Sequence, residues 1–386
     1  MQSTINWINN TQRFCQMCRF LCHLIFFCII PLQTIASDLQ DGELIFSNTK
    51  FESCMQNSCF HGLASYLDQI NYYIVDAKNL TKLTDQEVIL SDTQWLAAAG
   101  RFNVHLIKQP GLKLRMFDSK LTFKTNELTP PPYPSVQFST KNKVSEIAPE
   151  LVKIHYAHLW WPFRILAKAV KQSIFSIQNI TSVSWGWSLV LFSVLLKIAL
   201  LPVGYMTVQF QRRVSQIQAR LQPVLLEIKT KYDGEKAHNK LMQAYRDEGV
   251  SPFYTLKPML GMFIQIPIAI AVFNALAEMP EFLGQSFMWV DDLAYPDELL
   301  TFGMSIPFFG NSLNLMPFVM TFVTVFSTII FKNTCATGEE VARQKRKLYL
   351  MALAFFILFY PFPAVMVLYW TVANILQTIQ QHIIKI

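Results

Sequence analysis

The sequence predicts an all-α polytopic membrane protein, with a five-helix core, a preceding hydrophobic segment and a small β-containing external domain. Three observations lead there. Hydrophobic residues make up 52% of the chain and charged residues only 15%, a balance typical of membrane proteins. Several apolar runs have the length of a membrane-spanning helix. The loops between these runs alternate in charge, as cytosolic and external loops do.

The first 37 residues resemble an export segment. Arg13 and Arg19 precede or begin a short apolar stretch, and the small residues Ala36 and Ser37 follow it. This pattern suits a cleaved signal peptide and a retained transmembrane anchor equally. In both cases the sequence predicts that the next part of the chain is exported.

Residues 38–154 predict a small external domain. The composition becomes polar, the stretch KLRMFDSKLTF alternates as a strand would, and the proline cluster TPPPYPS is typical of a linker. Cys54 and Cys59 are candidates for a disulfide, because disulfides form outside the cytosol. The sequence leaves their pairing open.

Residues 155–386 contain the predicted membrane core. An interfacial helix is expected over 158–177, where tryptophans and other apolar residues alternate with basic ones. An ordinary amphipathic surface helix remains the alternative. Spans are expected at about 186–206, 258–277, 313–331, 347–360 and 362–384, the last two divided by Pro361 and Pro363. A helical hairpin over 207–257 joins the first two spans, with Asp233 and Gly234 at its turn.

Loop charge assigns the sides of the membrane. Residues 207–257 carry nine lysines and arginines against five acidic residues. The next loop contains Glu281, Asp291, Asp292, Asp297 and Glu298 without a basic residue, and the loop after it is basic again. The positive-inside rule therefore predicts a cytosolic hairpin, an acidic external loop and an external region over residues 38–183.

Lys197 lies in the middle of the run SLVLFSVLLKIALLP, near the expected bilayer midplane. A charge there costs about 2.5 to 3.5 kcal/mol, so we expect it to face the bundle interior or water. No predicted span supplies an acidic partner. Polar residues on this span and the others would either hydrogen-bond helix to helix or line a hydrated groove. They include Ser193 on the same span and Gln265, Asn274, Thr324, Asn374 and Gln377 on the others.

Enzyme motifs are absent from the sequence. It contains no HExxH, GxxxxGK[ST] or GxSxG, which are the patterns of metalloproteases, P-loop proteins and serine hydrolases. We therefore expect no catalytic residue, no metal, no cofactor and no recognition of nucleic-acid sequence.

Several motifs in order resemble the YidC family of membrane protein insertases. They are a WGWS start, a span with a midplane basic residue followed by LLP, a hairpin with LQP, a span with FIQIP, the loop FMWVDDLAYPD and the end VLYWTVANILQTIQQ. The resemblance covers about residues 155–384. Upstream, DTQWLAAAGRFNVHLI is similar to the end of the large periplasmic domain of Gram-negative members.

The resemblance implies a bacterial inner-membrane protein with a groove open to the cytosol and to lipid. The groove basic position falls on Lys197, its polar neighbour on Ser193, the span-three glutamine on Gln265, and the client-contacting aromatic on Tyr369 or Trp370. The full predicted groove is Lys197, Ser193, Gln265, Asn274, Thr324, Tyr369, Trp370 and Asn374. Lysine in place of the usual arginine keeps the charge but loses the bidentate fork.

The implied function is to admit polar segments of new membrane proteins into this groove and release their apolar helices into lipid. The implied partners are nascent membrane proteins and the bilayer, with the Sec translocon and the ribosome as further candidates. Two alternatives stay open at this stage. One is a translocon-associated chaperone or assembly factor without insertase activity of its own, and the other is a small transporter, which would favour internal repeats that the sequence lacks.

Overall fold

The computed structural model describes residues 43–44, 60, 62–84, 87–117, 120–124, 136–247, 249, 259–306, 309–330 and 338–384. The predictions for residues 1–37 and for Cys54 and Cys59 lie outside these residues. The chain divides into two compact units. The first comprises Met1–Phe46, Thr84–Asp92 and Lys108–Val136, and the second Ser47–Leu83, Thr93–Ile107 and Gln137–Ile386.

The first unit is built on an antiparallel sheet with strand order β1-β8-β7-β4. Its strands are β1 (Glu43–Leu44), β4 (Val88–Ile89), β7 (Lys113–Phe117) and β8 (Lys120–Lys124). β7 and β8 pair from Lys113↔Lys124 to Phe117↔Lys120, so a two-residue connection joins them. Leu114 and Leu121 are fully buried, as the predicted alternation of apolar and polar residues requires.

The second unit begins with a five-stranded sheet of order β3-β2-β5-β6-β9. Its strands are β2 (Asn71–Val75), β3 (Leu80–Lys82), β5 (Trp95–Ala99), β6 (Asn103–Ile107) and β9 (Val136–Thr140). Three short helical segments follow β9: η3 (Lys141–Lys143), α2 (Val144–Ile147) and η4 (Pro149–Ile154). Val144, Leu151 and Ile154 from these segments share a core with Tyr73 and Val75 of β2. These strands agree with the β character predicted upstream of residue 155.

The helix α3 (Trp161–Thr181) is amphipathic. Ala167, Val170 and Ile174 are buried at helical spacing, whereas Trp160 and Trp161 are 69% and 63% exposed. The helix ends at Ser182, whose left-handed conformation (φ 55°) turns the chain into α4 (Trp185–Ala199). α3 and α4 meet at a bend of 116°.

The span expected over 186–206 is not one uninterrupted helix. α4 ends at Ala199, Leu200 leaves the helical region, and α5 (Leu201–Lys231) starts beside Pro202. Proline has no N–H to donate, and its ring crowds the carbonyl four residues earlier. The first helix therefore ends just before Pro202, and Pro202 lies in the first turn of the next helix. Lys197 consequently occupies the last turn of α4.

The predicted hairpin region contains α5 and α6 (Gly234–Asp247). α5 begins at Leu201, inside the apolar run, and continues without interruption into the polar sequence after it. The predicted hairpin therefore starts within this helix and not at its first residue. Val214 and Leu221 of α5 form a small core with Ala244 and Tyr245 of α6. Gly234, at φ +57°, lies at the turn between the two helices, where a glycine accepts the left-handed conformation without strain.

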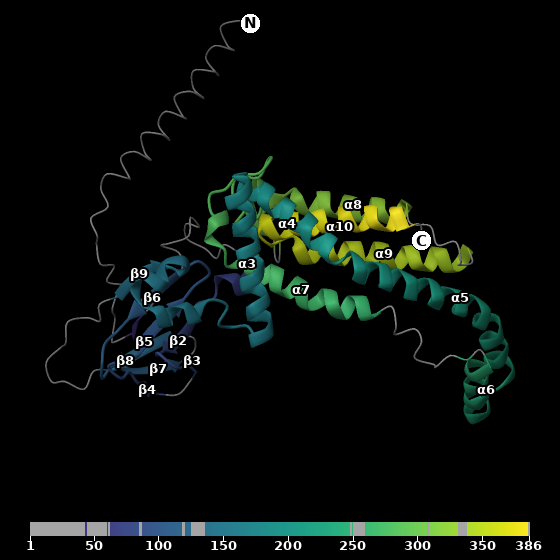
Figure 1. Cartoon of the computed structure of the whole chain (residues 1–386), viewed down its shortest axis with the longest axis horizontal. Coiled ribbons are helices and arrows are strands. Elements are labelled where there is room, and N and C mark those ends of the chain that lie inside the picture. The colour runs from purple at the N-terminus through teal and green to yellow at the C-terminus, as the bar shows by residue number, and fades with distance from the viewer. Residues whose placement is uncertain are drawn as a thin grey trace, which may run out of the picture. The chain divides into compact units, whose positions relative to one another are not determined.

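The remaining elements are α7 (Met259–Ala277), η6 (Pro280–Phe282), β10 (Glu298–Ile306), β11 (Gly310–Asn314), α8 (Met316–Ile330), α9 (Gly338–Phe359) and α10 (Ala364–Ile384). α10 packs against α4, α7 and α8 (Figure 1). α9 begins nine residues before the predicted span at 347, since the basic segment ahead of the apolar run is also helical.

The acidic loop after α7 contains a β-ribbon that sequence analysis does not predict. β10 and β11 pair antiparallel, with irregular register between Glu298 and Leu300 and between Thr301 and Ile306. Asp297 lies at the base of this ribbon and accepts hydrogen bonds from the Met316 backbone N (2.5 Å) and Trp289 Nε1 (3.2 Å). It thereby caps the first turn of α8, while its burial raises the pKa of the carboxyl.

Helices α3, α4, α7, α8 and α10 share one apolar core, to which α9 contributes Phe359. Gly186 of α4 lies directly against the Phe287 ring, where a Cβ would clash, so glycine allows the acidic loop to pack on the helix. Other faces of these helices expose large apolar side chains, including Leu195, Ile198, Phe263, Ile264, Phe322, Phe326, Leu350, Leu353, Ile375 and Ile379. Soluble monomers rarely expose apolar patches on this scale.

Among the described residues, no single helix has both the length and the apolar composition needed to cross a membrane. α3 and α4 meet that test together as a bent pair. Three shorter apolar helical segments lie at Phe263–Ala277, Met316–Ile329 and Ala364–Gln380.

Candidate functional site

Lys197 binds a partner on the last helix. Its Nζ donates a hydrogen bond to Oε1 of Gln377 on α10, and the lysine is half-buried. An amide oxygen can accept the ammonium proton without neutralising its charge. The contact thus keeps a cation among apolar helices with one hydrogen bond satisfied and others available. Sequence analysis named Gln377 as a polar span residue but did not include it in the groove.

A second polar contact lies one turn away on α10. Asn374 Nδ2 donates to Oγ1 of Thr324 on α8 at 3.1 Å. Because Asn374 and Gln377 are three residues apart on a helix, their side chains lie on neighbouring positions of one face. These two contacts together are called here the polar row. It consists of Lys197 on α4, Gln377 and Asn374 on α10, and Thr324 on α8.

Ser193 and Tyr369 are buried, and Trp370 is half-buried against the same core. Ser193 is 3% exposed, and its hydroxyl donates to the Leu189 carbonyl oxygen in the same helix at 2.8 Å. The Trp370 ring stacks on Phe273 of α7 at 5.8 Å between centroids, and it also contacts Phe355 and Phe359 of α9. Tyr369 meets the same Phe273 ring edge-on at 6.0 Å. Either aromatic could therefore move only together with this cluster.

Among the described residues, neither Gln265 nor Asn274 hydrogen-bonds to Lys197, whose bond goes to Gln377. Gln265 is exposed on α7, and Asn274 lies nine residues further along the same helix, about 14 Å away at 1.5 Å per residue. Asn274 Oδ1 lies 2.9 Å from Nε2 of His158. Asn274 therefore belongs to a second group of polar contacts, apart from the polar row.

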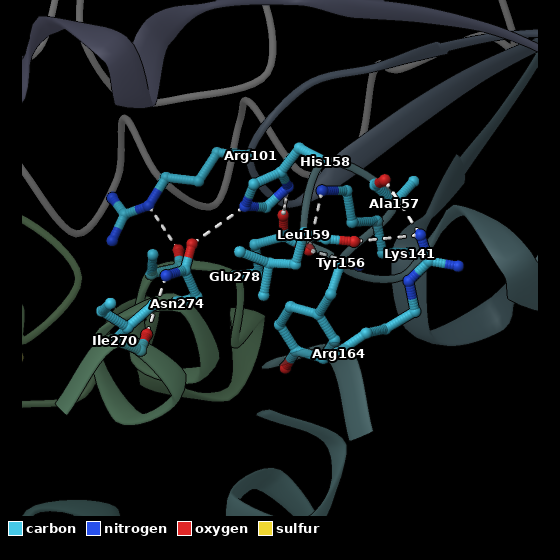
Figure 2. Close-up of polar contacts among 11 residues, drawn as sticks. Arg101, Lys141, Tyr156, Ala157, His158, Leu159, Arg164, Ile270, Asn274 and Glu278 are labelled. Carbon is cyan, nitrogen blue, oxygen red and sulfur yellow. Dashed lines mark hydrogen bonds and ion pairs between the residues drawn. The ribbon is translucent and has the colours of Figure 1, made fainter. Parts of the chain in front are cut away.

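The second site, named here the Glu278 cluster, consists of Glu278, Lys141, His158 and Asn274 (Figure 2). Glu278 directly follows α7. Its Oε2 pairs with Lys141 Nζ at 3.1 Å and accepts from the Tyr156 backbone N at 3.4 Å, while Oε1 lies 3.3 Å from His158 Nδ1. The Asn274 amide is oriented by its own donation from Nδ2 to the Ile270 carbonyl at 2.7 Å. Both ring nitrogens of His158 therefore face acceptor oxygens.

Arg101, from the turn between β5 and β6, reaches the same end of α7 (Figure 2). Its Nε donates to the Ala277 carbonyl oxygen and its Nη1 to the Ala294 carbonyl oxygen, both at 2.7 Å. The guanidinium also lies over the Phe102 and Phe60 rings, at 4.3 and 4.9 Å from their centroids. Arg101 is 4% exposed. A cation at the carboxyl end of a helix is favourable, because the free carbonyls there carry partial negative charge.

Arg101 and Lys141 together join the five-stranded sheet to the end of α7 and to the acidic loop. A second contact follows beside them, where Asn142 Nδ2 donates to Oε1 of Glu281 and Asn142 Oδ1 accepts from Lys171 Nζ. Sequence analysis missed this connection, since residues more than 100 positions apart form it. Within the described part of the chain, no group of three or more His, Cys, Asp or Glu side chains is arranged to hold a metal ion.

Comparison with known proteins finds a matching family profile and several similar proteins. The profile of the family described as "60Kd inner membrane protein" matches residues 176–386. The membrane protein insertase YidC of Janthinobacterium sp. (strain Marseille) is 26% identical over 369 residues, which cover 90% of this chain and 61% of that protein. YidC of Herminiimonas arsenicoxydans is 26% identical over 370 residues, covering 90% and 60%.

A third relative is more similar over a shorter stretch. YidC of Treponema denticola is 32% identical over 207 residues, which cover 52% of this chain and 34% of that protein. The chain thus spans less than two thirds of the length of each of these relatives.

Proposed function

Because this chain belongs to the 60Kd inner membrane protein family and is similar to YidC insertases, we propose that it inserts proteins into the bacterial inner membrane. The family membership confirms the resemblance drawn from the sequence motifs. The proposed activity is not enzymatic: it moves a polypeptide between environments and needs no covalent step.

The polar row from Lys197 to Thr324 is the observation that carries this proposal. It places an ammonium, two amides and a hydroxyl between helices whose other faces expose large apolar side chains. When a polar client segment crosses hydrocarbon alone, each backbone group without a hydrogen-bond partner costs several kcal/mol of free energy. The polar row offers hydrogen-bond partners along the way and so lowers that cost.

Lys197 gives the proposed groove a preference for acidic client segments. Its Nζ has donors beyond the one that Gln377 accepts, and a client carboxylate supplies both an acceptor and an opposite charge. The client's apolar helix then leaves past Tyr369 and Trp370 into lipid. Burial of its apolar surface in lipid drives this step, at about 25 cal/mol per Å².

The proposed topology follows the charges of the loops. The hairpin of α5 and α6 is cytosolic, and the acidic loop with β10 and β11 is external, together with the five-stranded sheet. The external loop supports closure on its side, since Phe287 packs on Gly186 and the loop backbone pairs with the start of α10 through Val365 N to Leu293 O (2.9 Å). The ribosome and the Sec translocon are further proposed partners of this protein.

Rescue of cells depleted of their own insertase tests this proposal. We expect expression of this chain to restore growth and the insertion of a small single-span client. A protease-protection assay on the client measures insertion, and a membrane-fraction immunoblot establishes that the chain is present. Stable accumulation in the membrane with no restored insertion would contradict the proposal and favour a chaperone that depends on another insertase.

A further inference from the structure

A cavity of about 260 Å³ opens beside the Glu278 cluster, away from the polar row. Its walls come from the helical turn η2 (Gly62–Asp68), strands β2 and β3, the β5–β6 turn, η4 and the end of α7. This volume is slightly below the range of about 300 to 1,000 Å³ typical of small-molecule sites. The cavity therefore fits a small polar group rather than a folded segment or a large cofactor.

Cations dominate the charged lining of this cavity. Lys82, Arg101 and Lys141 line it, against the single carboxylate of Glu278. The oxygens of that carboxylate already contact Lys141 Nζ, the Tyr156 backbone N–H and His158 Nδ1. An added negative charge therefore meets an excess of positive lining charge, and the low-dielectric walls strengthen the attraction.

Neutral donors complete the lining. Asn71 and Gln69 offer amide N–H groups, and Tyr66 and Tyr73 offer hydroxyls. Burial, with Glu278 nearby, raises the pKa of Tyr73 to about 12, so its hydroxyl keeps its proton at neutral pH. Lysine together with neutral N–H and O–H donors is a set of groups that binds phosphate oxygens.

The cavity lies close in the chain to the exposed tryptophans. His158 lines it, and Trp160 and Trp161 follow within three residues at the start of α3, both more than half exposed. Exposed tryptophans of this kind gather where lipid headgroups meet the hydrocarbon. The phosphate nearest to such a position is that of a phospholipid.

We propose that this cavity binds the phosphate of an anionic phospholipid headgroup, with Lys82 as its accessible cation. The site goes beyond the proposed insertion activity and does not depend on it. Lys82 is exposed at the end of β3, whereas Lys141 and Arg101 are buried and hold the sheet to α7. An incoming phosphate gains its strongest new contact from Lys82, and the two buried cations contribute their field.

Lys82→Glu tests the proposal, and Lys78→Glu is its matched control. Both lysines are exposed on the β2–β3 hairpin and both changes alter the charge equally, but only Lys82 lines the cavity. The purified full chain in a neutral detergent is titrated calorimetrically with dihexanoyl phosphatidylglycerol. We expect saturable binding that Lys82→Glu weakens about tenfold or more, and that Lys78→Glu changes by less than about twofold.

Three further probes identify the source of the phosphate. Dihexanoyl phosphatidylcholine should bind more weakly, because its ammonium meets the same cations. If inorganic phosphate binds as tightly as the lipid, the lipid assignment is overturned and the cavity is a site for soluble phosphate. If an acidic peptide binds, and neither phosphatidylglycerol nor inorganic phosphate does, the lipid assignment is also overturned and the cavity receives a protein segment. Equal lipid affinity in the wild type and Lys82→Glu also overturns the proposal.

Discussion

Replacing Lys197 with alanine is expected to slow the insertion of clients that carry acidic external segments by about tenfold or more. The reason is electrostatic. A carboxylate about 4 Å from an ammonium gains about 4 kcal/mol at the effective dielectric constant of partly buried sites. Desolvation of both groups offsets part of this gain, and the tenfold change in rate corresponds to about 1.4 kcal/mol that remains.

The same client with its aspartates and glutamates changed to asparagines and glutamines supplies the internal comparison. Its insertion should respond little to Lys197→Ala, since it brings no charge for the lysine to pair with. Lys197→Arg should retain most of the activity, because the positive charge remains. Lys168→Ala is the control variant, as Lys168 is exposed on α3 and lies outside the polar row.

Insertion rates are measured as the growth of a protease-protected client fragment in proteoliposomes. An equal loss for the acidic and the neutral client would mean that Lys197 supports the structure and does not select clients. An unchanged rate for both clients would remove Lys197 from the mechanism.

Replacing Arg101 with alanine should produce the largest loss of stability in the described part of the chain. Two hydrogen bonds from a charged donor, at about 1.5 to 3 kcal/mol each, contribute about 3 to 6 kcal/mol together. The variant also loses the contacts with the Phe60 and Phe102 rings and leaves the carbonyls of Ala277 and Ala294 without this donor. We expect a clearly lower midpoint of thermal unfolding in detergent, and faster proteolysis of the five-stranded sheet.

Two variants test whether this effect comes from the arginine contacts. Arg101→Lys keeps the charge but cannot reach both carbonyls with a planar fork, so it should lie between wild type and Arg101→Ala. Arg220→Ala removes an exposed arginine of α5 and should change stability by less than about 0.5 kcal/mol. An Arg101→Ala protein as stable as the Arg220→Ala protein would refute the assigned role.

Helical periodicity and loop composition predicted much of the helical region. The predicted hairpin forms, with Val214 and Leu221 of α5 packed against α6, and Pro361 and Pro363 lie between α9 and α10. Lys197 stood out because charge in an apolar run is costly wherever the helix lies. Its partner Gln377 could not be identified, since the sequence gives each helix's polar positions but not their relative heights.

Other features depend on tertiary contacts that leave no local pattern. In the β10–β11 ribbon the adjacent residues Leu299 and Leu300 are both exposed, and so is Phe302, so its sequence lacks the period-two alternation by which strands are recognised. The Glu278 cluster joins residues from the sheet, the approach to α3 and α7, and only folding brings them together.

Insertion by the purified protein tests the central claim most directly. Liposomes that contain only this chain are mixed with a newly synthesised single-span client, and protease is added from outside. Our account predicts a protected client fragment that protein-free liposomes do not yield and that Lys197→Ala reduces for an acidic client. A folded, correctly reconstituted protein that protects no more client than bare liposomes would contradict it.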